Sequence, residues 1–441
     1  MNLDNWLAQR AETCPDRVAV IADDVALTYE QLEAEATRAA RRLAARGVRR
    51  GASVAIVRPA GLEYVISIHA LMKLGAVLHP VNPDLAAPEL EAGLQRIAPA
   101  LVVTESDHAT MSEADLPLLG EHDLDALQCR ILTSGTTGSP RPVGLTYGNH
   151  LWSAVGSAFN LGIDPGDRWL CCLPLYHVAG LEIVMRSVIY GTGTVVHDGF
   201  DTERVAESLE HDGITLASLV TTQLVRLLEA GVNLSRPRAV LVGGGPVPIE
   251  ILEEAMERGA SVVQTYGLTE TASQVTTLAP HDARRKLGSA GRPLLTTHLR
   301  ISEGEICVQG PVVAPGCADE DGWLHTGDLG RIDDEGFLYV EDRLGDVIVT
   351  GGENVLPGEV EEVLLRHPAV ADAAAVGRVD PEWQEAVEAV VVLRDGAAAE
   401  AAELREHCAE SLARYKVPKR IRFASELPRT PSGKLLRRAL R

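Results

Sequence analysis

Apolar positions in the first hundred residues follow two kinds of pattern. Residues 53–59 and 76–82 are short, nearly continuous apolar runs, whereas residues 29–47, 62–75 and 88–99 repeat apolar positions every three or four residues. The first pattern predicts buried strands and the second predicts helices. Their alternation predicts parallel β-α-β units, with helices packed on the faces of a sheet.

The first predicted helix carries a capping signal at each end. Thr28, with Gln31 three positions later, fits a capping box at the start. Gly47 fits a stop signal at the end, because glycine readily adopts the left-handed conformation that commonly terminates helices. The sequence therefore predicts a helix that begins after Thr28 and ends at Gly47.

The same alternation returns in the middle of the chain. Apolar runs at residues 214–220, 239–245 and 261–267 flank helical stretches at residues 222–231 and 248–259. Glycines follow several of these runs, so we expect loops at the carboxyl ends of the strands. Open α/β sheets bind their ligands at that edge.

The pattern changes after about Gly330. Residues 336–343 and 346–352 are predicted to form a pair of strands. A helix, two more strands and a second helix are predicted over residues 357–368, 371–378, 387–393 and 398–413. A small α+β unit of about a hundred residues is large enough to be a separate domain.

We place the boundary between the two parts at residues 343–346, where Gly345 can absorb backbone rotation as a hinge. The prediction is an α/β fold. Its large N-terminal domain, residues 1–342, has layered β-sheets and helices, and its small α+β C-terminal domain covers residues 347–441.

Composition narrows the class of protein. The 441 residues are enough for two or more domains, and 46% hydrophobic residues with a mean hydropathy of +0.03 suit a soluble globular protein. We find no apolar run of about 18 residues that would span a membrane, and no signal peptide, so we expect a cytoplasmic protein. The seven cysteines show neither CxxC nor Cys/His metal spacing, which predicts reduced, mostly buried thiols.

The formal charge of −21 argues against a nucleic-acid-binding protein. The charge is uneven, because residues 412–441 contain ten Lys or Arg and a single acid, Glu426. This basic tail is either an ordinary solvated surface or a surface that meets a polyanionic ligand. Composition does not decide between them.

Residues 131–150, "ILTSGTTGSPRPVGLTYGNH", concentrate glycine and hydroxyl side chains, which suit an anion. The segment is not a Walker A loop, since G-x-x-x-x-G-K-[ST] is absent. It resembles the phosphate loop of the adenylate-forming enzymes. Arg141 replaces the usual lysine by a planar cation, and Pro142 replaces the usual glycine and removes one N–H. The matching residues are Thr133, Ser134, Gly135, Thr136, Thr137 and Gly138.

Further motifs of that family follow in its usual order. "QTYGLTETAS", residues 264–273, resembles the motif in which a tyrosine lies beside adenine, a threonine approaches the α-phosphate and a glutamate holds Mg²⁺. The resemblance assigns these roles to Tyr266, Thr269 and Glu270. The resemblance also places the phosphate loop and Arg141 in this nucleotide site, together with Gly245, Gln264, Thr265 and Gly267.

Two motifs near the C-terminus complete the resemblance. "GWLHTGDLG" and "EDRLGDVI" supply Asp328 and Arg343, the family's contacts to the ribose hydroxyls. "LPRTPSGKLLRRAL" places Lys434 where the family has a mobile catalytic lysine. The matches run from Thr133 to Lys434, so the chain resembles this family over most of its length.

The resemblance implies a two-step acid–thiol ligase that uses ATP, Mg²⁺ and coenzyme A. A carboxylate attacks the α-phosphate and pyrophosphate leaves, while Mg²⁺ on Glu270, the loop donors and Lys434 neutralise the developing charge. The C-terminal domain, which is mobile in the family, then swings about Gly345. This motion brings the coenzyme A region, which consists of Gly351, Gly352 and Glu353, to the acyl group.

One subgroup, the o-succinylbenzoate:CoA ligases of menaquinone synthesis, is most similar in residues 173–196, 241–248, 264–280 and 286–294. The resemblance places His177 at the mouth of the acyl pocket as a catalytic residue, and small residues leave room for an aromatic ring. The predicted pocket consists of His177, Gly180, Gly243, Gly244, Ser289, Ala290 and Gly291.

Three alternatives stay open. In place of an o-succinylbenzoate:CoA ligase, the sequence also allows a CoA ligase for another aryl or medium-chain acid, a stand-alone enzyme that loads a carrier protein, or an inactive nucleotide-binding regulator. The predicted partners are a small carboxylic acid, ATP and coenzyme A, with no nucleic acid and no membrane span. A homodimer is compatible with the sequence.

Overall fold

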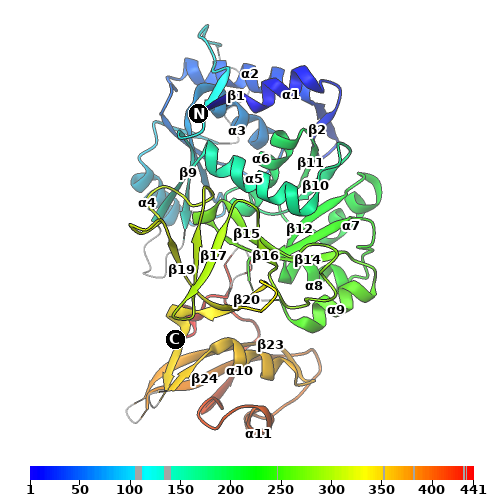
Figure 1. Cartoon of the computed structure of the whole chain (residues 1–441), viewed down its shortest axis with the longest axis vertical. Helices are drawn as coiled ribbons and strands as arrows, with labels where there is room; N and C mark the ends of the chain where they lie inside the picture. The colour runs from blue at the N-terminus through cyan, green and yellow to red at the C-terminus, as the bar shows by residue number, and fades with distance from the viewer. Residues whose placement is uncertain are drawn as a thin grey trace. The chain divides into compact units, whose positions relative to one another are not determined.

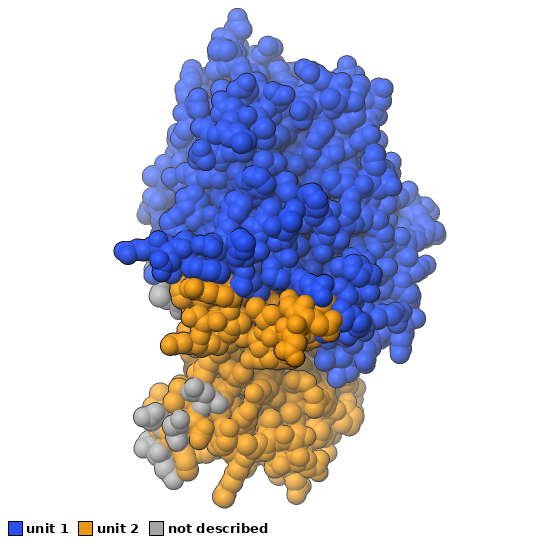
Figure 2. All heavy atoms as spheres, viewed as in Figure 1, with its two compact units in different colours: residues 1–243, 249–299, 308–324 blue, residues 244–248, 300–307, 325–441 orange. Residues whose placement is uncertain are grey.

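The computed structural model describes residues 1–104, 112–133, 141–245, 247–350, 353–380, 383–430, 433 and 435–441. The chain divides into two compact units (Figure 2). Unit 1 consists of residues 1–243, 249–299 and 308–324. Unit 2 consists of residues 244–248, 300–307 and 325–441.

A nine-stranded sheet forms the largest layer of unit 1 (Figure 1). Its central strands are parallel, and antiparallel strands lie at both edges. The strand order is β16 (Arg292–Pro293), β15 (Ser273–Thr277), β14 (Val262–Leu268), β13 (Ala239–Gly243), β12 (Leu216–Val220), β10 (Arg168–Cys171), β11 (Gly193–Val196), β2 (Val18–Ala22) and β3 (Val25–Thr28). The predicted parallel β-α-β arrangement is confirmed.

A five-stranded sheet forms a second layer of unit 1. Its order is β6 (Leu101–Val103), β4 (Ser53–Val57), β5 (Val77–Val81), β8 (Leu127–Thr133) and β9 (Arg141–Thr146). The first four strands are parallel, and β9 is an antiparallel edge strand. A short pair, β1 (Asn2–Asp4) with β7 (Glu121–Asp123), is also antiparallel.

Helices pack around these sheets, with α2 against α3 and α5 against α6 (Figure 1). At the start of α2, the Thr28 hydroxyl accepts the Gln31 N–H and the Gln31 carboxamide accepts the Thr28 N–H, which confirms the capping box. The helices are α1 (Trp6–Thr13), α2 (Tyr29–Ala45), α3 (Leu62–Leu74), α4 (Ala87–Ile97), α5 (Tyr147–Leu161), α6 (Val178–Tyr190), α7 (Thr202–His211), α8 (Thr221–Glu229) and α9 (Ile249–Glu257).

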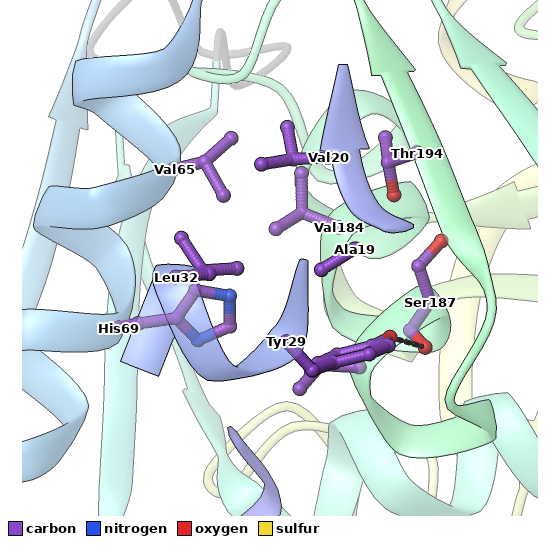
Figure 3. Close-up of a pocket in the computed structure, with 10 residues that line it drawn as sticks. Ala19, Val20, Tyr29, Leu32, Val65, His69, Val184, Ser187 and Thr194 are labelled. Atoms are coloured by element: carbon purple, nitrogen blue, oxygen red, sulfur yellow. Dashed lines mark hydrogen bonds between the residues drawn. The ribbon is translucent and has the colours of Figure 1, made fainter. Parts of the chain in front are cut away.

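A small cavity of about 10 Å³ lies in the core of unit 1, between β2, α2, α3, α6 and β11 (Figure 3). The Tyr29 hydroxyl lies 2.9 Å from the carbonyl oxygen of Ser187, and burial lowers the pKa of His69, which also lines the cavity, to about 3. This volume is at the lower limit of what a single water molecule needs. The lining includes none of the predicted site residues, so we assign the cavity to core packing.

Most of a four-stranded sheet and a separate five-stranded sheet lie in unit 2. The first has the order β17 (His298–Ser302), β18 (Glu305–Gln309), β19 (Leu324–Ile332) and β20 (Leu338–Arg343). The second consists of β22 (Glu353–Val355), β21 (Ile348–Thr350), β24 (Gln384–Leu393), β23 (Val370–Asp380) and β25 (Arg420–Phe423). Helices α10 (Pro357–Leu365) and α11 (Ala401–Ser411) bury apolar side chains against it.

The predicted strand pair at residues 336–343 and 346–352 is wrong. β20 pairs with β19, whereas β21 pairs with β22 and β24 in the other sheet. The 3₁₀ turn η3 (Leu344–Asp346) between β20 and β21 carries the chain from one sheet into the next. Periodicity identifies strands but does not identify their partners, which explains the error.

All seven cysteines are free thiols. Five are buried, and Cys14 and Cys317 are half-buried, which confirms the prediction of mostly buried, reduced cysteines. Among the described helices, none has the length and apolar character needed to cross a bilayer.

Candidate active site

The motif at residues 264–273 forms a sharp turn between two strands of unit 1. β14 ends at Leu268, the 3₁₀ turn η2 (Thr269–Thr271) carries Thr269 and Glu270, and β15 returns antiparallel. A Cβ atom at Gly267 would lie 1.4 Å from the carbonyl oxygen of Ser273, so only glycine fits there. Ala272 and Ser273 have φ angles of 47° and 82°, a conformation that non-glycine residues rarely adopt and that is often found at functional sites.

Contacts from neighbouring elements hold this turn. The carbonyl oxygen of Glu270 accepts the N–H of Ala314 at 2.8 Å, and the Ser153 hydroxyl donates to the carbonyl oxygen of Ala272 at 2.6 Å. The Arg186 guanidinium in turn donates to the Ser153 hydroxyl at 2.9 Å. The backbone that presents Thr269 and Glu270 is therefore fixed from two sides.

Arg186 belongs to a buried charged cluster on α5 and α6. The Glu182 carboxylate hydrogen-bonds Nδ1 of His150 and lies 3.9 Å from Nε of Arg186. All three side chains are at most 3% exposed. Buried charges require partners, and here one carboxylate serves both basic groups. The sequence analysis did not identify this cluster, although Glu182 and Arg186, four positions apart in an apolar helix, were a usable signal.

The Glu270 side chain is suited to a divalent cation. It is partly exposed, and no described residue forms an ion pair or hydrogen bond with its carboxylate. Mg²⁺ prefers oxygen ligands and is usually bound by one or two carboxylates together with substrate phosphates. The nearby Cys317 thiol has a raised pKa, first because of burial and second because of the charge on Glu270, so it stays neutral.

The structure brings Asp328 and Arg343 together in unit 2. They face each other on the antiparallel strands β19 and β20, and Nε of Arg343 lies 3.0 Å from Oδ1 of Asp328. The Asp328 N–H donates to the Thr326 hydroxyl at 3.1 Å, and Gly327 donates to the Glu305 carboxylate at 2.8 Å. The T-G-D turn is thus held by its own threonine and by β18.

His177 immediately precedes α6 in unit 1. Burial lowers its pKa to about 4, so the imidazole is neutral at pH 7. Its Nε2 atom has no hydrogen-bond partner among the described residues, and the same holds for Oε1 of Gln264. Buried polar atoms without a partner are uncommon in proteins, and a bound ligand is one way to satisfy them.

The small residues of the predicted acyl pocket are close to backbone atoms. A Cβ atom at Gly180 would lie 2.4 Å from the carbonyl oxygen of Pro174, and one at Gly243 would lie 2.8 Å from that of Thr265. Gly291 has a φ of 91°, and its N–H donates to the Ser289 hydroxyl. Chain packing alone accounts for these glycines. The predicted pocket residues also include Gly244 and Ala290, and their role in receiving an aromatic ring stays a prediction.

Comparison with known proteins identifies the family. The AMP-binding enzyme family matches residues 7–130 and 120–317, and the AMP-binding enzyme C-terminal domain matches residues 359–434. The chain belongs to the AMP-binding enzymes. This confirms the resemblance to adenylate-forming enzymes that the motifs indicated.

Among curated relatives of this AMP-binding enzyme, a 2-succinylbenzoate–CoA ligase of Bacillus cereus (strain Q1) is 41% identical over 477 residues, covering 100% of this chain and 98% of the relative. A solved o-succinylbenzoate CoA synthetase from Bacillus subtilis, in complex with the acyl-adenylate intermediate OSB-AMP, has a TM-score of 0.94 and 39% identity over 100% of this chain and 98% of that one. The same synthetase with ATP and magnesium ion has a TM-score of 0.92 at 39% identity, covering 100% of both chains. MatB from Rhodopseudomonas palustris, at 24% identity and a TM-score of 0.92, covers 100% of this chain and 98% of that one and shares the fold.

Several predicted site residues of this AMP-binding enzyme lie outside the described residues, namely Ser134, Gly135, Thr136, Thr137, Gly138, Gly351, Gly352 and Lys434. The flanking positions are described. Thr133 and Arg141 face each other at the ends of β8 and β9, and the Arg141 side chain is exposed. Pro142 lies on the edge strand β9, where a missing N–H is tolerated.

A cluster of charges in unit 2 surrounds Arg437, three positions after Lys434. Its guanidinium lies 2.7 Å from Glu361, 3.3 Å from Asp346 and 3.9 Å from Asp342. The Arg437 side chain is 13% exposed. Because Asp342 precedes Gly345 and Asp346 follows it, Arg437 connects the C-terminal tail with both sides of the predicted hinge. The sequence analysis treated this arginine only as part of a basic tail.

Burial of histidines predicts that the protein loses stability in mild acid. Burial lowers the pKa of five of them, so the folded state binds fewer protons than the unfolded state below about pH 6.5. The free energy of unfolding should therefore fall as pH drops from 6.5 towards 4, by about 1 kcal/mol for each histidine at pH 5.5. The five are His69, to about 3, and His79, His122, His177 and His197, each to about 4.

Urea unfolding at pH 7.5, 6.5 and 5.5 measures this effect. We expect a smaller loss over the first interval, where the histidines of the unfolded state begin to bind protons, and a loss about three times larger over the second. His281→Gln is the control, because that side chain is 81% exposed and its removal should leave the loss unchanged. Equal stability at pH 7.5 and 5.5 would contradict the prediction.

Proposed function

We propose that this chain is an ATP-dependent 2-succinylbenzoate:CoA ligase of menaquinone biosynthesis. It forms 2-succinylbenzoyl-adenylate and pyrophosphate, then 2-succinylbenzoyl-CoA and AMP. The similarity to curated 2-succinylbenzoate–CoA ligases over the whole chain carries the proposal. The rigid turn with Thr269 and Glu270 and the paired Asp328 and Arg343 support it.

In the first step, a carboxylate must approach a negatively charged triphosphate. Mg²⁺ bound at Glu270 would neutralise phosphate charge there. The Thr269 hydroxyl and the N–H groups of the phosphate loop would donate hydrogen bonds to the transferring group, and Tyr266 would lie beside adenine. Such preorganised donors act mainly by electrostatics and positioning, and no protein nucleophile is needed.

Other residues have supporting roles in the proposal. Asp328 accepts hydrogen bonds from the ribose hydroxyls, and its ion pair with Arg343 orients the carboxylate. Arg141 supplies an exposed cation beside the phosphate loop. The neutral imidazole of His177 can donate one hydrogen bond to the acyl substrate but supplies no charge.

We propose that the thioester step requires residues 347–441 to move about a hinge at Gly345. Gly345→Pro should lower thioester formation more than adenylation, because proline fixes φ and also restricts the preceding residue. Gly345→Ala is the matched control, since no atom lies within 4 Å of an added Cβ and the φ angle is not positive. Single-turnover measurement of each half-reaction separates the steps. An unchanged thioester rate in Gly345→Pro would exclude Gly345 as the hinge.

The identity of the acid is tested by a panel. The purified chain receives ATP, Mg²⁺ and coenzyme A with 2-succinylbenzoate, benzoate or a medium-chain fatty acid, and AMP release is measured. We expect the largest kcat/KM for 2-succinylbenzoate. A higher value for another acid would reject the substrate assignment, activity only with a carrier protein would reject the ligase, and ATP binding without turnover of any acid would support an inactive regulator.

The proposal includes a cytoplasmic location, where ATP and coenzyme A are available, and a homodimer. Light scattering coupled to gel filtration measures the oligomeric state directly.

A further inference from the structure

We propose that Glu305, Cys307 and His325 form a binding site for a thiophilic divalent cation, for which Zn²⁺ is the first candidate. This site is separate from the Mg²⁺ site proposed at Glu270. It rests on contacts within unit 2 and holds whichever acid the enzyme activates.

Two adjacent strands bring the three side chains to one face of a sheet. Glu305 and Cys307 are two positions apart on β18 and therefore point to the same face. His325 lies on β19, the next strand of the sheet. The 18 positions between Cys307 and His325 explain why no metal-binding spacing is visible in the sequence.

The distances between the donor atoms are close to those of a tetrahedral site. Sγ of Cys307 lies 3.6 Å from Nδ1 of His325, which lies 2.7 Å from Oε2 of Glu305. With Zn–S of about 2.3 Å and Zn–N of about 2.05 Å, tetrahedral coordination places sulfur and nitrogen about 3.6 Å apart. The nitrogen and oxygen ligands would be about 3.3 Å apart, so that pair needs to open by about 0.6 Å.

The surroundings favour binding. The His325 side chain is 47% exposed, which permits this small movement and gives the cation and a water ligand access from solvent. The other carboxylate oxygen of Glu305 accepts the Gly327 N–H at 2.8 Å, and this contact orients the carboxylate as outer partners of metal ligands commonly do.

The chemistry of the donors selects the metal. A thiolate with an imidazole favours zinc and similar metals over Mg²⁺ and Ca²⁺, which prefer sites made of oxygen ligands. Binding requires the Cys307 thiol to lose its proton, so affinity should rise with pH.

Cobalt is the probe for this site, because a Co²⁺–thiolate bond absorbs in the near ultraviolet. Titration of the purified full-length chain with Co²⁺ should produce this charge-transfer band with one equivalent of metal, and Zn²⁺ should displace it. Cys307→Ser should abolish the band, and His325→Gln should weaken Co²⁺ binding at least tenfold. Cys14→Ser and His298→Gln, a half-buried cysteine and an exposed histidine elsewhere, are the matched controls.

Two outcomes overturn the proposal. One is the absence of a thiolate band in the native chain, and the other is a band of equal strength in Cys307→Ser. Should Cys307→Ser fail to fold, the exposed position of His325 keeps the test available, and unchanged Co²⁺ affinity in His325→Gln then overturns the site. The spectrum does not depend on catalysis, so failure of this proposal and failure of the ligase assignment are distinguishable.

Discussion

Lys434→Ala is expected to abolish adenylation while it spares thioester formation from supplied acyl-adenylate. In the proposed reaction, the Lys434 ammonium neutralises charge that develops as the carboxylate attacks and pyrophosphate leaves. Loss of one such electrostatic contact in an active site typically costs about 10²–10³ in rate. The second step transfers the acyl group to a thiol without pyrophosphate and does not need this cation.

The described residues on either side of Lys434 contact each other through the backbone. The N–H of Leu436 donates to the carbonyl oxygen of Pro428, and Arg429 pairs with Leu435. Gly433, directly before the lysine, has a φ of 80°. Backbone contacts therefore join the described residues on the two sides of position 434.

Two half-reactions test the role of Lys434. ATP–pyrophosphate exchange reports adenylation, and release of coenzyme A thioester from synthetic 2-succinylbenzoyl-adenylate reports the second step. Lys419→Ala is the matched control, because Lys419 is an exposed lysine of the same basic tail and lies over the Trp383 ring. It should retain both activities. An equal loss of both steps in Lys434→Ala would contradict the assignment.

Arg437→Ala is expected to lower both the adenylation rate and the stability of unit 2. Arg437 neutralises Glu361, Asp346 and Asp342 in a largely buried cluster. Removing one partner of a buried ion pair typically costs about 3–5 kcal/mol, because the remaining charges are left uncompensated. The adenylation rate should fall about tenfold or more, since the tail that carries Lys434 loses its anchor near Gly345.

Arg438→Ala is the control for this prediction. Arg438 is the next residue, is exposed and has the same charge, so its removal should change neither rate nor stability. Arg437→Lys should recover only part of the loss, because an ammonium cannot form the two parallel contacts that the guanidinium makes with Glu361. Urea unfolding and ATP–pyrophosphate exchange measure the two effects. Wild-type stability and exchange in Arg437→Ala would contradict the account.

The sequence predicted the local structure of this protein better than its long-range pairing. The strand–helix alternation and the capping box at Thr28 were correct because they depend on neighbouring residues. The pairing of β20 was wrong, because periodicity does not tell which strand lies alongside. The same limit hid the Glu182 cluster, where α5 and α6 contribute residues about thirty positions apart.

The same contrast between local motifs and long-range contacts holds for the candidate site. The family motifs predicted the roles of Asp328 and Arg343, and the structure adds that they form an ion pair across two strands. Motif spacing gave no reason to expect that Ser153 holds the turn after Glu270, or that Arg437 pairs with residues on both sides of Gly345. Such contacts depend on tertiary packing, which a motif does not record.

The identity and stoichiometry of the products test the central claim most directly. The purified chain is incubated with 2-succinylbenzoate, ATP, Mg²⁺ and coenzyme A, and the products are quantified by mass spectrometry and nucleotide chromatography. The account predicts one 2-succinylbenzoyl-CoA, one AMP and one pyrophosphate for each ATP consumed. Formation of ADP and phosphate, or no thioester on coenzyme A, would contradict it.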